Sequence, residues 1–356
     1  MSPTDFEPVR RLLHGAVGTV FPAAQLLVVD DFQRVFYEPA GDCTRETLFD
    51  LASLTKALST TTLVMRLLDA RKLRLSDELY PGGASIELAL CHATGLPPWR
   101  ALHQAAAPLL TRPGLSPGPG PGTAASDDNA RRAIVDAARR EPLEYPPGTR
   151  SAYSDLGFIL LGDTVERVGG ARLDAQWDAL GFAPTYHPDP AACAPTEILA
   201  EGALRGVVHD DNARAMGGVA GHAGLFGDAA GVSTVIEALV RASWIPGKRR
   251  TSGKTATLVQ PETVRRFWHP CAVPGSTWCL GWDRPATTGL SSAGARWPRD
   301  GVGHLGYTGC SIWIDPPRAR WVILLSNRVH PTRRNESIKP FRPLLHDAIV
   351  RALDGD

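Results

Sequence analysis

The chain has 356 residues and a formal charge of +1, because 38 basic residues are almost balanced by 37 acidic ones. This balance predicts neither a basic surface suited to nucleic acid nor an acidic tail, so small-molecule chemistry is the better interpretation. No stretch approaches the roughly 20 apolar residues that a membrane span requires, and residues 1–17 do not resemble a signal peptide. We therefore expect a soluble, cytoplasmic protein with no nucleic-acid or membrane partner.

Apolar periodicity predicts regular elements at both ends of the chain. These elements are a helix over 5–17, a hairpin of strands over 24–29 and 34–37, a second hairpin over 310–315 and 320–326, and a closing helix over 341–353. If the two hairpins join one antiparallel sheet, the terminal helices can cover it.

The middle of the chain is predicted to be a mainly helical insertion. It begins with an amphipathic helix that runs from Ser53 to about Ala70. The sequence thus predicts an α+β fold, a single domain with two lobes and a cleft at their junction. The α/β lobe is expected at about 1–55 and 298–356, and the helical lobe at about 56–297.

Ser53 and Lys56 form the first candidate site, in the segment Leu-Ala-Ser-Leu-Thr-Lys-Ala-Leu. Three positions along a helix are close to one turn, so the amine can reach the hydroxyl. A lysine among apolar neighbours is unusual, and burial favours its neutral form. A chance occurrence of two common surface residues is the competing interpretation.

Tyr153 and Asp155 form the second candidate site. A Pro-Pro-Gly turn at 146–148 leads to Tyr153, which stands just before a helix predicted over 156–168 and capped by Asp155 or Ser154. Most tyrosines at a helix entrance only pack, and a phenolate base needs cations nearby.

The third candidate is the glycine-rich run over 301–309, which contains His304, Gly306 and Tyr307 and leads into a strand. Glycine lets the backbone approach a ligand closely. A free N–H on such an edge strand can form half of an oxyanion hole, with the N–H of a serine nucleophile as the other half. A similar triplet that begins at His222 precedes a helix, and we interpret it as a coincidental match.

In this order, the S-x-x-K, Y-S-D and H-x-G motifs resemble those of serine hydrolases related to class C beta-lactamases and penicillin-binding proteins, a group that includes carboxylesterases. The segments 90–97, 145–148 and 217–226 are similar to that family too. The resemblance covers most of the chain. It implies a beta-lactamase/transpeptidase-like fold, an antiparallel sheet flanked by helices, and no metal or organic cofactor.

The same resemblance implies roles for individual residues. Ser53 would be the acylated nucleophile and Lys56 its proton acceptor, while Tyr153 would be the general base or the acid for the leaving group. Gly306 and Tyr307 would supply the backbone donors of the edge strand. The implied partner is a small ester, amide or lactam.

Two positions depart from the family pattern. Beta-lactam enzymes of this type usually have Asn where Asp155 stands and Lys where His304 stands. An ionised Asp155 only accepts hydrogen bonds and would repel a carboxylate on the substrate. A neutral His304 would attract that carboxylate less than a lysine does. We therefore expect uncharged esters or amides to be better substrates than beta-lactams, with beta-lactamase or D-amino-acid peptidase/transpeptidase activity of the same fold as the alternative. Asp155 is expected to pair with Lys56 or with His304.

The remaining polar residues allow two other interpretations, a metal site and a binding protein without catalytic activity. His209 and Asp210, with His222, suggest a metal site, but they lack the i, i+4 spacing of a helical zinc site, so a helix cap or pocket lining is preferred. His92 is interpreted as a structural histidine. The two altered motifs also allow an inactive homologue that binds a peptide or cell-wall fragment.

Two further expectations concern chain segments and cysteines. The Pro/Gly-rich run over 112–128 predicts a mobile surface loop. The six scattered cysteines, with no C-x-x-C pair, are expected to be free thiols, and Cys310 could be reactive if exposed.

Overall fold

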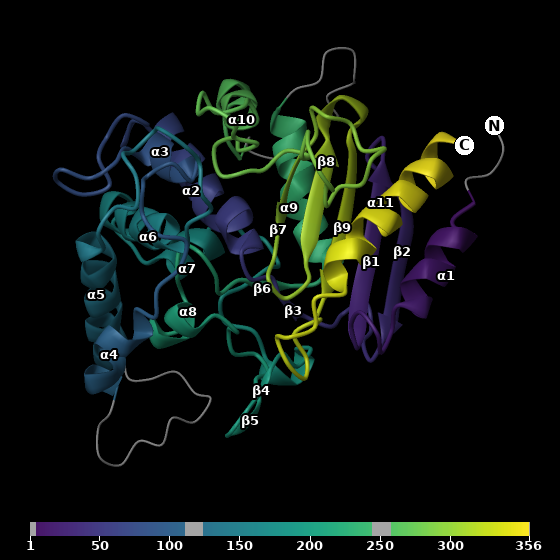
Figure 1. The fold of residues 1–356 in the computed structure, drawn as a ribbon, viewed down its shortest axis with the longest axis horizontal. Coiled ribbons are helices and arrows are strands. Elements are labelled where there is room, and N and C mark those ends of the chain that lie inside the picture. Colours follow the sequence, from purple (N-terminus) through teal and green to yellow (C-terminus); the bar gives the residue numbers. More distant parts are fainter. Residues whose placement is uncertain (1–4, 111–123, 244–257, 356) are drawn as a thin grey trace.

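The computed structural model describes residues 5–110, 124–243 and 258–355. Both ends of the chain build one five-stranded antiparallel sheet in the order β2-β1-β9-β8-β7 (Figure 1). Its strands are β1 (Ala23–Asp30), β2 (Gln33–Gly41), β7 (Val302–Leu305), β8 (Ser311–Asp315) and β9 (Arg320–Ser326). The two predicted hairpins are confirmed, and β1 joins them by pairing with β9, with Ala24 opposite Ser326.

Alternating apolar side chains give the sheet two buried faces. Leu26 and Val28 pack with the terminal helices α1 (Glu7–Gly15) and α11 (Ile338–Asp354). Leu27 and Val29, on the opposite face of β1, belong to the larger core, which extends into the helical middle of the chain. The architecture is the predicted α+β arrangement, with α1 and α11 on one side of the sheet (Figure 1).

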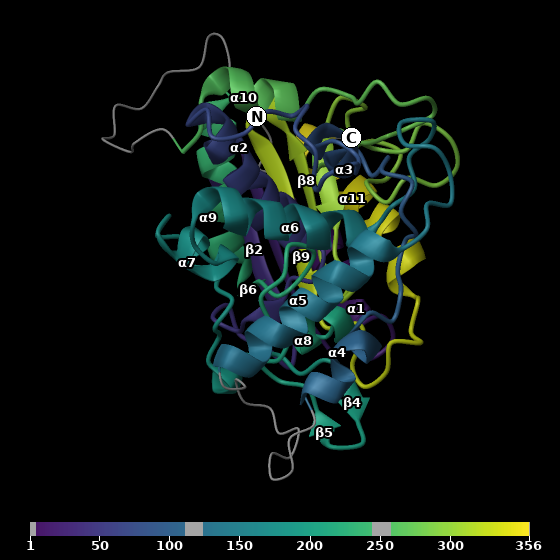
Figure 2. The same ribbon diagram turned by 90° about the vertical axis from the view of Figure 1, so that its left-hand side faces the viewer.

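Helices and very short strands make up the middle of the chain, with α5 and α6 in the foreground of Figure 2. The helices are α2 (Thr61–Asp69), α3 (Ile86–Leu90), α4 (His103–Leu110), α5 (Ala124–Arg140), α6 (Asp155–Gly169), α7 (Leu173–Asp178), α8 (Asp211–Ala215), α9 (Ala229–Ala242) and α10 (Pro261–Phe267). The short strands are β3 (Phe49–Asp50), β4 (Ile198–Leu199), β5 (Gly202–Ala203) and β6 (Phe226–Gly227). The division into two lobes at about residues 56 and 297 stays a proposal.

The predicted helix from Ser53 has a more complex start than expected. Ser53 lies in a turn, a π-helical segment follows over Lys56–Thr60, and α2 then runs to Asp69. π-Helical turns are rare and often occur at functional sites. Lys56 is the first residue of this segment.

The structure corrects the expectation of free cysteines and describes only part of the predicted loop over 112–128. Cys91 and Cys271 form a disulfide although 180 residues separate them, so the prediction that all cysteines are free was wrong. Most of the predicted loop over 112–128 lies outside the described residues, and its last residues, from Ala124, already belong to α5. Within the described part of the chain, no helix is long and apolar enough to cross a membrane.

Candidate active site

A strained turn presents Ser53 at the end of β3. Ala52 adopts a left-handed backbone conformation with φ of 48°, which is uncommon for a residue with a side chain. Asp50 stabilises this turn, because its carboxylate accepts the N–H of Ala52 at 2.8 Å and that of His209 at 2.7 Å. Burial raises the pKa of Asp50 to about 6. Ser53 itself is partly exposed.

Lys56 is fully buried beneath Ser53. Its Nζ donates to Ser53 Oγ at 2.9 Å and to the carbonyl oxygen of His222 at 3.0 Å, and it lies 2.7 Å from Asp155 Oδ1. Burial lowers the pKa of the amine, and the Asp155 carboxylate opposes this shift. Of the two partners expected for Asp155, the structure therefore selects Lys56.

Tyr153 approaches Ser53 from the entrance of α6. Its phenol donates to Ser53 Oγ at 2.6 Å. The hydroxyl of Ser154 accepts the N–H of Gly157 and caps α6, so the carboxylate of Asp155 is free to face Lys56. Burial, reinforced by Asp155, raises the pKa of Tyr153 well above its usual value, so the phenol stays protonated at neutral pH.

His304 lies on β7, buried beside the same cluster. Its ring centroid is 6.4 Å from that of Tyr153 and 5.6 Å from that of Trp278. Burial, together with the nearby Lys56, lowers the pKa of His304 to about 3, so its imidazole is neutral. Nδ1 lies 2.9 Å from the carbonyl oxygen of Leu305, a geometry that assigns the ring proton to Nδ1. The Nε2 lone pair has no partner among the described residues.

The end of β7 lies against the backbone that carries the nucleophile. A Cβ atom at Gly306 would come within 2.7 Å of the carbonyl oxygen of Leu51, so only glycine permits this approach. The N–H of Gly306 donates to the carbonyl oxygen of Cys310 at 2.7 Å and is therefore engaged. The next residue, Tyr307, is half exposed, and neither its N–H nor that of Ser53 donates a hydrogen bond within the described residues.

The predicted pocket residues His209, Asp210 and His222 flank the same site. Nε2 of His222 lies 2.7 Å from Asp210 Oδ1, and the His209 ring stacks on Tyr307 at 5.8 Å. Although burial alone would raise the pKa of Asp210, the His222 ring lowers it. His222, whose triplet matches the H-x-G motif only by coincidence in our interpretation, accepts a hydrogen bond from Lys56 through its carbonyl oxygen. No group of three or more His, Cys, Asp or Glu among the described residues could hold a metal ion.

Sequence reasoning missed the way His92 supports Tyr153. The ring of His92 lies 4.6 Å from that of Tyr153, and its Nδ1 accepts the N–H of Ser154 at 3.1 Å. Its carbonyl oxygen also accepts the N–H of Ala152 at 2.8 Å. The structural interpretation of His92 agrees with these contacts, but only the fold reveals that they hold the tyrosine turn.

Cys310, the cysteine nearest to the glycine-rich run, is buried. Its exposed fraction is 0%, and burial raises the pKa of its thiol to about 11. The condition under which Cys310 was expected to be reactive, exposure to solvent, is therefore not met.

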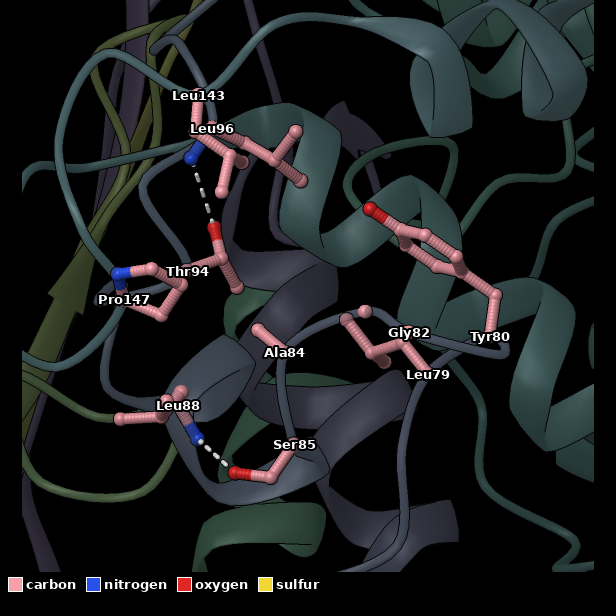
Figure 3. A pocket seen from close by; sticks show the side chains of 11 residues that line it. Leu79, Tyr80, Gly82, Ala84, Ser85, Leu88, Thr94, Leu96, Leu143 and Pro147 are labelled. Atoms are coloured by element: carbon pink, nitrogen blue, oxygen red, sulfur yellow. Dashed lines mark hydrogen bonds between the residues drawn. The ribbon is translucent and has the colours of Figure 1, made fainter.

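A pocket of about 250 Å³ lies elsewhere, in the helical region beside α3 (Figure 3). Leu88, Leu96 and Leu143 give it apolar walls, and the hydroxyl of Thr94 already accepts the N–H of Leu96. None of the candidate site residues lines this pocket. Its chemistry offers no nucleophile with a neighbouring base, so it does not compete with Ser53 as the active site.

The fold and the hydroxyl, amine and phenol cluster define a serine hydrolase. The Beta-lactamase family model matches residues 9–346, so the chain belongs to the beta-lactamase family. A protein provisionally named D-alanyl-D-alanine carboxypeptidase from Escherichia coli K12 is 27% identical over 90% of this chain and 81% of its own. An N-acetylmuramyl-L-alanine amidase from Bacillus subtilis 168 is also 27% identical, over 90% of this chain and 80% of its own.

Solved structures share the fold at lower identity. EstCE1, a hydrolase with promiscuous acyltransferase activity, gives a TM-score of 0.69 at 20% identity and covers 96% of this chain and 97% of its own. The octameric penicillin-binding protein homologue from Pyrococcus abyssi gives 0.69 at 16%, covering 99% and 78%. The predicted family and fold are thereby confirmed.

Proposed function

We propose that this serine hydrolase forms an acyl-enzyme at Ser53 and acts on small esters or amides that need no carboxylate. The observation that carries the proposal is the position of Ser53 Oγ, 2.9 Å from Lys56 Nζ and 2.6 Å from the Tyr153 hydroxyl. A nucleophile within reach of both a proton acceptor and a proton donor meets the geometric requirement for acyl transfer.

Lys56 is the better candidate for the proton acceptor. Its lowered pKa makes a neutral amine accessible, whereas the raised pKa of Tyr153 disfavours a phenolate. In the acylation step, the Ser53 hydroxyl proton moves to Lys56 Nζ while Oγ bonds to the substrate carbonyl carbon. The N–H groups of Ser53 and Tyr307 stabilise the oxyanion.

Tyr153 is the better candidate for the acid. When the tetrahedral intermediate collapses, the bond to the leaving group breaks and that group takes the phenolic proton. The Lys56 ammonium then gives its proton to the Tyr153 phenolate, directly or through a water molecule, because the acylated Ser53 oxygen carries no exchangeable proton; Lys56 Nζ lies 5.0 Å from the centre of the Tyr153 ring. Water then attacks the acyl carbon and gives one proton to Lys56, and Lys56 passes this proton to Ser53 Oγ as the acyl–oxygen bond breaks and the acid is released.

The electrostatics support a preference for substrates without a carboxylate. His304 is neutral with a pKa of about 3, and Lys56 is paired with Asp155, so neither position offers a free cation. Hydrolysis of a short acyl ester should therefore be faster than that of a chromogenic cephalosporin, which carries a carboxylate. The reverse order of kcat/KM would refute this preference.

Labelling of Ser53 tests the enzyme class directly. A fluorophosphonate probe should label the wild-type protein and not the Ser53→Ala variant. Folded wild-type protein that resists labelling would favour the alternative of an inactive peptide-binding homologue.

A preference for amides over esters is the second candidate, supported by the similarity to the Bacillus subtilis amidase. A carboxypeptidase substrate ends in a carboxylate, so the neutral His304 makes that activity less suitable than cleavage of an internal amide. Release of D-alanine from a D-Ala-D-Ala peptide, measured beside cleavage of the same peptide with an amidated end, separates these two activities.

A further inference from the structure

Arg342 is a buried cation that the proposed chemistry does not use. It lies in α11, on the side of the sheet away from the helical region, and only 6% of it is exposed. Its Nη2 donates to the carbonyl oxygens of Cys310 at 2.7 Å and Gly306 at 3.1 Å. No carboxylate of the described residues pairs with it, and its Nε has no partner there. A buried cation without an anion is costly, so its presence calls for a physical reason.

The identity of the bonded peptide group supplies that reason. The carbonyl of Gly306 and the N–H of Tyr307 belong to one planar peptide unit. Arg342 therefore binds the carbonyl side of the same unit whose N–H is the proposed oxyanion donor. A cation at the carbonyl oxygen polarises the unit and makes its N–H a stronger donor.

The same contacts also fix the direction of that donor. The carbonyl of Cys310 accepts from both Arg342 and the N–H of Gly306, which ties the turn after β7 to α11. Oxyanion donors are most effective when they are oriented before the reaction begins. We propose that Arg342 is a positioning residue that orients and polarises the Gly306–Tyr307 peptide for oxyanion stabilisation, an inference that rests on the proposed function.

Arg328 provides a matched control in the same turn. It is also buried, and its Nε donates to the carbonyl of Tyr307 at 2.8 Å. That carbonyl belongs to the next peptide unit, whose N–H is that of Thr308. The Arg328 side chain also donates to the carbonyls of Arg333 and Asn335, and its guanidinium lies 4.4 Å from the centre of the Tyr307 ring. Its replacement thus removes an equal charge and several contacts of this turn, none of them with the peptide group that carries the proposed oxyanion donor.

The experiment compares Arg342→Met, Arg342→Lys and Arg328→Met. We expect Arg342→Met to lower kcat for a p-nitrophenyl ester by about 10- to 100-fold, less than the ~10²–10³-fold loss typical of deleting a direct oxyanion donor. KM should change little. Inhibition by phenylboronic acid, which forms a tetrahedral anion on the serine, should weaken by a similar factor. Arg342→Lys should recover much of the loss, and Arg328→Met should lose less.

Two outcomes would overturn the role of Arg342. The first is a folded Arg342→Met variant whose kcat and boronate affinity equal those of the wild type. The second is an equal loss of kcat in Arg342→Met and Arg342→Lys with no change in the boronate affinity of either variant. If Arg342→Met does not fold, the uncharged Arg342→Gln is subject to the same comparison with Arg342→Lys. Wild-type protein that is neither labelled at Ser53 nor active refutes the proposed function as well, whereas an active wild type with unaffected variants refutes only this inference.

Discussion

Opposing influences set the protonation of the Lys56 amine. Burial lowers its pKa, and the Asp155 carboxylate at 2.7 Å raises it. Since the proposed acceptor must be neutral, the pKa of Lys56 would control the acid limb of the pH profile. In beta-lactam enzymes of related type, an Asn at this place cannot raise the lysine pKa in the same way.

Asp155→Asn should shift the acid limb of kcat/KM to lower pH. Removing the carboxylate leaves burial unopposed, so the pKa of Lys56 falls further and the neutral amine persists in more acidic solution. A pH profile of ester hydrolysis measures the shift. Asp163→Asn, on the same helix and paired with Arg139, is the control and should retain the wild-type profile. An unchanged profile in Asp155→Asn would disprove its electrostatic role.

Tyr153→Phe should reveal the role of the phenol through the leaving group. A general acid typically contributes about 10²–10⁴-fold to the rate, and poor leaving groups depend on it most. We expect a loss of about 10²-fold or more in kcat/KM for an alkyl ester or amide and a clearly smaller loss for a p-nitrophenyl ester. Equal losses for the two substrates would argue that Tyr153 acts in another way.

At the scale of elements, the disulfide joins two segments that frame the site. Cys91 immediately precedes His92, and Cys271 lies in the loop that leads to Trp278. The His92 ring contacts both Trp278, at 4.2 Å, and Tyr153, at 4.6 Å. The bond therefore restrains both the loop and the turn that support the phenol.

Removing this disulfide should lower the stability of the protein. Because the bond closes a long loop, we expect Cys91→Ser with Cys271→Ser to reduce the free energy of unfolding by about 2–4 kcal/mol, measured by denaturant titration. Cys43→Ser, which changes a free cysteine, is the control. Equal stability of the double variant and the wild type would contradict the prediction.

Local spacing and the order of the motifs explain which site residues could be predicted from the sequence. Ser53 and Lys56 lie about one helical turn apart, whereas the roles of Tyr153 and His304 followed from the resemblance carried by the order of the three motifs. Arg342 gives no local signal, because its partner Gly306 is 36 residues away. Asp50 likewise acts on His209, 159 residues along the chain. Such contacts arise only when the chain has folded.

At the scale of the whole molecule, four strands of the sheet and the two terminal helices were predictable from apolar alternation and periodicity, whereas the fifth strand, β7, lies in what the sequence presents as a glycine-rich run. The disulfide and the π-helical start of the Ser53 helix were not predictable either. The first depends on a spatial approach across 180 residues. The second lies in a segment that makes contacts with distant parts of the chain, such as the hydrogen bond from the Thr60 hydroxyl to the carbonyl oxygen of Gly221 at 2.7 Å. Local propensity contains neither kind of information.

Buried histidines should make the stability of the molecule sensitive to acid. Burial, together with Arg342, lowers the pKa of His346 to about 4, against about 6.5 in an unfolded chain. As the pH falls below about 6.5, the unfolded state binds this proton first, so stability is lost. The raised pKa of Asp50, about 6, acts in the opposite direction, because protonation relieves a buried charge.

His346→Gln should remove one of these contributions. We expect the loss of unfolding free energy between pH 7 and pH 5 to be smaller by about 2 kcal/mol in this variant than in the wild type. Denaturant titrations at both pH values measure the difference. The control is His269→Gln, whose imidazole is exposed and whose acid loss should match that of the wild type. An unchanged acid loss in His346→Gln would show that this histidine is not responsible.

The pairing of β1 with β9 has a consequence for biosynthesis. The two strands are separated by nearly the whole chain, yet Ala24 lies opposite Ser326 in the centre of the sheet. Because the ribosome synthesises the chain from the N-terminus, the unpaired backbone edge and apolar side chains of β1 are exposed long before β9 emerges. The sheet can therefore be completed only after β9 and α11 have been synthesised, and until then the unpaired backbone of β1 is open to aggregation.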